Sequence, residues 1–153
     1  MTPRPPLRWS DAFWVRPCAF IIVILSFCAG LCAADPADVP RHILAGIAFV
    51  ESSSHYRADG SLRYVNQSRG TSGERGPFQI LPATARQFGF SPSLCEVDPP
   101  YAEKCARHIL AHYYGICGSW SECAAAWRKG LGGRHRKTAT DYAARVISVG
   151  TNN

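Results

Sequence analysis

Apolar residues recur every three or four positions along most of the chain from residue 39 onward, which is the spacing of one helix face. Capping residues and glycines interrupt the pattern and mark helix ends. The expected helices cover about 39–53, about 82–88 before Gly89, Asp98 to Gly115, Ser119 to Gly130, and Thr138 or Thr140 to Gly150. The pattern predicts a mainly α fold, built as a helical bundle.

One stretch departs from the helical pattern. Residues 58–79 are rich in Gly, Ser and Arg, and they contain a β-prone segment at Arg63–Gln67. We expect a loop or a small hairpin lobe beside the helices.

The first 34 residues have the pattern of a secretory signal peptide. Three arginines precede a long apolar run, and Ala33 and Ala34 stand before the return of polarity at Asp35. We expect residues 1–34 to be removed, leaving residues 35–153 as an exported periplasmic or secreted domain that is not held in a membrane. The alternative is a retained anchor, because an apolar run of about 17 residues approaches the shortest that spans a bilayer.

Length and charge narrow the possible partners. The chain has 153 residues, of which 46 % are hydrophobic, so it can form one domain with a modest core. The formal net charge is +6, and removal of residues 1–34 takes away three Arg and one Asp and leaves +4, which suits a polyanionic partner such as a cell wall. The tight basic cluster at 134–137 is typical of a solvated loop, and no nucleic-acid motif accompanies it. We expect a monomer that does not bind nucleic acid.

Four cysteines follow the expected signal peptide: Cys95, Cys105, Cys117 and Cys123. In an oxidising compartment an even set predicts two disulfides, with three possible pairings. We favour Cys95 with Cys105 and Cys117 with Cys123, each tying a loop to the following helix. Zinc is the alternative, but neither gap has the short CysXaaXaaCys spacing that tetrahedral zinc sites prefer.

Two histidines, His108 and His112, stand one helical turn apart and could share a metal ion. No carboxylate accompanies them in the HisGluXaaXaaHis arrangement. We expect no metal and no other cofactor.

Glu51 carries the strongest chemical signal. It continues the apolar stripe of Ile43 and Ile47 instead of leaving it, so we expect it on the inward side near the end of the first helix. Burial disfavours the charged form of a carboxyl and raises its pKa, which suits a general acid near neutral pH. The structural alternative is a carboxyl that reaches water or accepts a hydrogen bond from a loop.

Several blocks follow one another in a fixed order. They are Glu51 with two serines after it, then Gly73–Ile80, Pro82–Ala85 and Ala124–Gly130. This series, between about Val39 and Val149, resembles the family of soluble-lytic-transglycosylase-like (SLT) domains, relatives of goose-type lysozyme that cleave the glycan strands of peptidoglycan. The resemblance implies a lysozyme-like fold with a small lobe over an active-site cleft.

The resemblance also implies a reaction. A lytic transglycosylase cleaves the β-1,4 bond between N-acetylmuramic acid and N-acetylglucosamine and leaves a 1,6-anhydromuramic acid end. Glu51 would serve first as acid and then as base, and Tyr142 would bond to Glu51 and position it.

The turn at 76–79 would contact the sugar. Gly76 would let the backbone approach closely, Phe78 would offer an apolar wall, and Gln79 would bond to hydroxyl or acetamido groups. Core packing is the other interpretation of Phe78. Trp127 stands where a later family block has an aromatic residue, and we expect it to contact the substrate as well.

Two positions depart from the family pattern. Arg128 stands where members usually have asparagine, and Gly70 stands where they tend to have serine. The asparagine and serine roles are therefore filled differently here or not at all.

Two other functions remain open. A muramidase hydrolase of the usual type needs a second carboxyl to activate water, for which Asp59 or Glu74 is near enough in sequence. The second is a peptidoglycan-binding accessory module of a secretion system, with little catalysis.

Overall fold

The computed structural model describes residues 34–64 and 69–152, all of which belong to one structural unit, Leu31–Asn153. The expected signal peptide lies outside the described residues except for Ala34. Within the described part the chain is mainly α, as predicted. The elements are η1 Pro36–Asp38, α1 Arg41–Ser52, β1 His55–Tyr56, β2 Leu62–Arg63, α2 Pro82–Gln87, α3 Pro92–Val97, α4 Pro99–Cys117, α5 Trp120–Lys129, η2 Leu131–Gly133 and α6 Lys137–Thr151.

Side-chain caps begin the two helices at which sequence signals predicted them. The Asp98 carboxylate accepts a hydrogen bond from the Tyr101 amide at 3.1 Å and starts α4. The Ser119 hydroxyl accepts one from the Glu122 amide at 3.3 Å and starts α5. The expected end of α4 at Gly115 is wrong, because the left-handed residue that closes the helix is Gly118, with φ of 72°.

The short helix α3 was not predicted, because its six residues are too few to show a helical period. A small hairpin was predicted as one of two possibilities for residues 58–79, and β1 and β2 form one that begins slightly earlier, at His55. His55 pairs with Arg63 and Tyr56 with Leu62 in antiparallel register. The expected strand at 63–67 thus overlaps β2 at Arg63 and then enters the undescribed residues 65–68.

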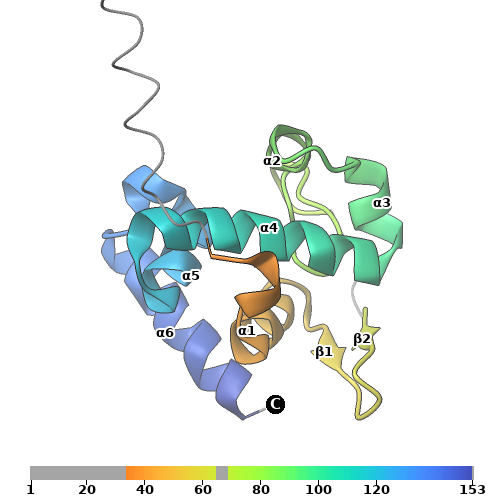
Figure 1. The fold of residues 1–153 in the computed structure, drawn as a ribbon, viewed down its shortest axis with the longest axis horizontal. Coiled ribbons are helices and arrows are strands. Elements are labelled where there is room, and N and C mark those ends of the chain that lie inside the picture. Colours follow the sequence, from red (N-terminus) through yellow and green to blue (C-terminus); the bar gives the residue numbers. More distant parts are fainter. Residues whose placement is uncertain (1–33, 65–68, 153) are drawn as a thin grey trace, which may run out of the picture. The chain divides into compact units, whose positions relative to one another are not determined.

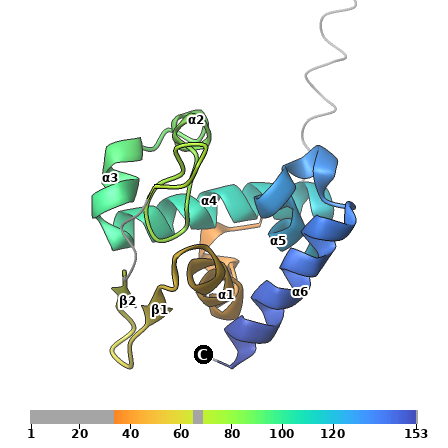
Figure 2. The ribbon, with the colours of Figure 1, turned by 180° about the vertical axis from the view of Figure 1, so that it is seen from behind.

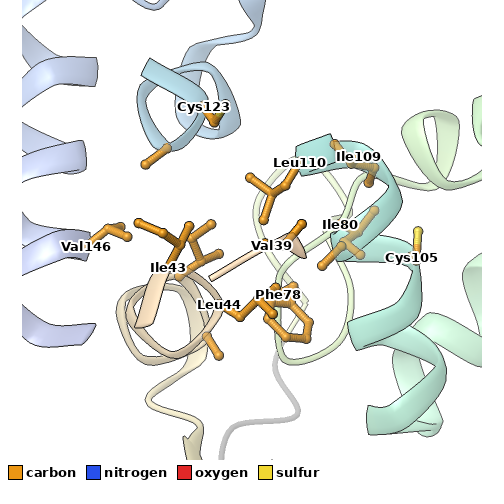
Figure 3. Packing of buried hydrophobic residues seen from close by; sticks show 14 of the residues in the cluster. Val39, Ile43, Leu44, Phe78, Ile80, Cys105, Ile109, Leu110, Cys123 and Val146 are labelled. Carbon is orange, nitrogen blue, oxygen red and sulfur yellow. The ribbon is translucent and has the colours of Figure 1, made fainter. Parts of the chain in front are cut away.

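The core lies where α1 meets α4, α5 and α6. Figure 3 shows Ile43 and Leu44 of α1 among Ile109 and Leu110 of α4, with Val146 of α6 on the other side. All five side chains are at most 2 % exposed. Because α1 buries residues 43–48 among these helices, it is the central helix of the bundle.

The helices α1 and α6 lie side by side (Figure 1) and approach unusually closely through glycines. A Cβ on Gly46 would overlap the backbone carbonyl of Val146, and one on Gly150 would overlap the carbonyl of His42. Gly150 was expected to end the last helix, but it lies inside α6 and permits this contact.

The four cysteines are free thiols in the described structure, so the predicted disulfides are not present in it. The favoured partners are nevertheless neighbours. The Cys95 and Cys105 thiols influence each other's pKa, and so do the Cys117 and Cys123 thiols. Burial, with a smaller contribution from Cys117, raises the pKa of the Cys123 thiol to about 12.

Among the described residues, no helix combines the length and apolar character that crossing a membrane requires. Viewed from behind (Figure 2), α2 and α3 lie toward one end of α4, and α5 and α6 lie toward the other. The last turn of α1 lies between these two groups, and the functional candidates gather there.

Candidate active site

Glu51 and Tyr142 meet at the contact between α1 and α6. The tyrosine hydroxyl donates a hydrogen bond of 2.7 Å to Oε1 of Glu51. The two residues are 91 positions apart in the chain, and their helices are brought together by the glycine contacts described above. This is the hydrogen bond that the family resemblance implied, and the positioning role of Tyr142 stays a prediction.

Burial is the largest influence on the carboxyl of Glu51, and it raises its pKa above the ordinary value. The hydrogen bond from Tyr142 and the positive charge of Arg128 act in the opposite direction, while the negative charge of Glu74 adds to the rise. The net effect favours the protonated acid at higher pH than for an exposed glutamate.

Glu51 opens into a cavity of about 100 Å³ between α1, α5 and the 74–84 segment. Its apolar lining comes from Ile80, Leu81, Ile109, Tyr113 and Trp127. Its polar lining comes from Glu51, Glu74, Gln79, Thr84 and Arg128. An apolar wall with a few polar groups around one carboxyl is the ordinary composition of a ligand site.

The turn at 76–79 is built tightly. Backbone hydrogen bonds of 3.0 and 2.9 Å between Arg75 and Ile80 close it, and Gln79 occupies left-handed space with φ of 49°. Such a conformation is costly for a residue with a side chain and is found disproportionately at functional sites. Gln79 lines the cavity, and its side-chain amide donates to the carbonyl of Gly76 at 2.9 Å.

Two members of that turn have structural roles instead of the expected sugar contacts. Phe78 is 0 % exposed and packs in the core with Leu44, as Figure 3 shows. Gly76, with φ of 75°, is buried where a Cβ would overlap the carbonyl of Cys95. Alternation along the turn sends Gln79 to the cavity and Phe78 to the core.

Hydroxyl groups join the acid's helix to this turn. The Ser52 hydroxyl lies 2.7 Å from the carbonyl oxygen of Pro77 and 2.6 Å from the Ser54 hydroxyl. Both serines are buried. Sequence analysis gave Ser52 and Ser54 no hydrogen-bonding role, although a run of three serines, Ser52–Ser54, directly follows the candidate acid.

A family model described as Transglycosylase SLT domain matches residues 32–147. The chain belongs to the transglycosylase SLT domain family. No curated protein and no solved structure matched the sequence.

The structure shows the surroundings of the two positions at which this SLT domain departs from the family pattern, 128 and 70. Arg128, in place of asparagine, lines the cavity beside Trp127. Gly70 stands in place of serine, and a Cβ there would overlap the carboxylate of Glu74 as that side chain lies in this structure. That carboxylate also accepts a hydrogen bond of 2.9 Å from the Ser72 amide. Glu74 therefore occupies the space that a side chain at position 70 would take.

The remaining candidates of the SLT domain lie elsewhere. Asp59 is exposed, accepts hydrogen bonds from Ser61 and does not line the cavity. His108 packs against Phe90 with ring centroids 5.1 Å apart, and His112 packs against Phe88 at 5.3 Å. Within residues 34–64 and 69–152, no group of three or more His, Cys, Asp or Glu side chains could hold a metal ion.

Proposed function

We propose that this SLT domain is a peptidoglycan lytic transglycosylase. The observation that carries the proposal is the half-buried Glu51 at the cavity, with a raised pKa and one carboxylate oxygen held by Tyr142. The substrate is the glycan strand, cleaved between N-acetylmuramic acid and N-acetylglucosamine. The protein acts after export, on the cell wall.

In the first step Glu51 donates its proton to the glycosidic oxygen. The bond from this oxygen to C1 of the muramyl residue breaks, its electron pair stays on the oxygen, and positive charge develops at C1. The raised pKa supports this step, because a protonated carboxyl is available near neutral pH.

In the second step the Glu51 carboxylate accepts the proton of the muramyl C6 hydroxyl as O6 bonds to C1. The 1,6-anhydro ring closes, Glu51 is protonated again, and no water is consumed. Because Tyr142 bonds to Oε1, we infer that Oε2 exchanges the proton with the substrate.

A muramidase hydrolase is the second candidate function. The position of Glu74 at the cavity supports it. Glu74 lines the same cavity and lies close enough for its charge to raise the pKa of Glu51. A hydrolase of this kind needs a second carboxyl near the acid to activate water, and Glu74 is the candidate for that role at this cavity. Asp59 does not line this cavity.

Digestion of purified peptidoglycan distinguishes these functions. The full-length protein and its Glu51→Gln variant are incubated with peptidoglycan, and the soluble products are weighed by mass spectrometry. We expect anhydromuramic ends from the first protein and a loss of at least about 100-fold in the variant. Products one water heavier, with reducing ends, would support the hydrolase. Binding without products from either protein would support an accessory module.

A further inference from the structure

Arg128 is an unpaired guanidinium at the wall of the cavity. It lies in the last turn of α5, is exposed, and lines the cavity together with Glu51 and Trp127. Within the described part of the chain it makes no hydrogen bond or ion pair. In contrast, Arg107 pairs with Glu103 at 2.8 Å and Arg134 with Glu122 at 3.3 Å.

The positive charge of Arg128 acts on both Glu51 and Tyr142. It lowers the pKa of Glu51 and that of Tyr142, against the larger effect of burial. A cation that opposes the protonation of the acid does not assist the first chemical step. Its place at the cavity wall is better explained by a negatively charged group that arrives with the substrate.

The proposed substrate carries such a negatively charged group. This step rests on the proposed function: a muramyl residue bears a lactyl carboxylate, free in peptide-free strands, or a peptide that ends in carboxylates, whereas N-acetylglucosamine bears none. A guanidinium fork matches a carboxylate with two parallel hydrogen bonds. We propose that Arg128 is a specificity-determining residue that binds a carboxylate of the muramyl substituent.

Trp127 and Arg128 together suit such a residue of the glycan strand. Trp127 is half-buried and offers an aromatic surface to a sugar ring, and the neighbouring guanidinium lies at the same end of α5. Lys129 follows directly, is equally exposed, and does not line the cavity. It therefore provides a matched control for general electrostatic attraction.

Binding to soluble fragments tests the proposal independently of turnover. The full-length chain carries Glu51→Gln, alone or with Arg128→Gln or Lys129→Gln, and Kd is measured by calorimetry. One ligand is a peptide-free tetrasaccharide of alternating N-acetylglucosamine and N-acetylmuramic acid. The second is the same tetrasaccharide with each lactyl carboxylate converted to a methylamide, and the third carries peptide stems.

We expect Arg128→Gln to weaken binding of a carboxylate ligand by about tenfold, the usual effect of losing a hydrogen bond to a charged group. It should leave the methylamide ligand unchanged, and Lys129→Gln should leave all three unchanged. A loss on the peptide-free ligand identifies the lactyl carboxylate, and a loss confined to the third ligand identifies the peptide. Three results would overturn the proposal. Arg128→Gln could weaken binding of the carboxylate and methylamide ligands equally, Arg128→Gln and Lys129→Gln could change Kd equally, or none of the protein variants could bind any ligand. The digestion above tests turnover separately, so the two failures are distinguishable.

Discussion

Gly46 of α1 packs directly on the backbone carbonyl of Val146 of α6, with no room for a Cβ between them. Val146 lies one helical turn after Tyr142, and Gly46 lies little more than one turn before Glu51. The close approach of the two helices therefore sets the distance across which the tyrosine reaches the acid.

We expect Gly46→Ala to separate α1 from α6. The added methyl group should reduce the free energy of unfolding by about 1–3 kcal/mol, the usual cost of overpacking, and should reduce peptidoglycan cleavage further by displacing Tyr142. Urea unfolding and product release measure the two effects. Gly132→Ala is the control, because nothing lies within 4 Å of its Cβ position. Equal behaviour of the two variants would contradict the role given to this contact.

Tyr142→Phe should move the alkaline limb of the pH–rate profile upward. The tyrosine hydrogen bond stabilises the charged carboxylate and lowers the pKa of Glu51, so its removal raises that pKa and extends the protonated acid to higher pH. We also expect kcat to fall about tenfold to a hundredfold, because the acid loses its positioning partner. An unchanged limb would show that Tyr142 does not bond to the acid during turnover.

Glu74→Gln should move the same limb in the opposite direction. The negative charge of Glu74 raises the pKa of Glu51, so the amide lowers it and the acid is lost at lower pH. In a transglycosylase, kcat at the optimum should stay within about threefold of its original value. In a hydrolase it should fall at least about 100-fold, since water loses its base. Asp59→Asn, remote from the cavity, is the control and should match the unmodified protein.

Glu51→Gln should stabilise the fold at neutral pH. Burial raises the folded-state pKa of Glu51 above its unfolded value, so the stability linked to its protonation is present below the unfolded pKa and is lost as pH rises through the folded pKa. The amide never carries the charge, and Tm at pH 7 should rise on the order of a few degrees. The difference should shrink at pH 4. A Tm difference independent of pH would assign the effect to something other than titration of Glu51.

In an oxidising compartment, oxidation should join the two neighbouring thiol pairs, which are unbonded in the described structure. Peptide mapping of protein produced in an oxidising compartment, without reductant, should show Cys95 bonded to Cys105 and Cys117 to Cys123. Reduction should then cost about 2–4 kcal/mol of unfolding free energy. Recovery of any other pairing, or of four free thiols under these oxidising conditions, would contradict this expectation.

The local features of this protein followed from the order of its residues. Helix periods, the caps at Asp98 and Ser119, and the inward position of Glu51 are set by interactions within a few residues, which a linear pattern displays. The family blocks added Tyr142 as the partner of the acid, and its hydroxyl is bonded there.

Only the tertiary structure decided which side chains of the 76–79 turn face the core. Phe78 is buried and its neighbour Gln79 lines the cavity, and a change of one residue in the register of the turn would exchange them. The same holds for Gly150, which looked like a helix stop but lies against the carbonyl of His42 and permits helix contact. These roles depend on atoms from distant parts of the chain. A sequence fixes such neighbours only through the packing of the whole fold, and no local spacing contains them.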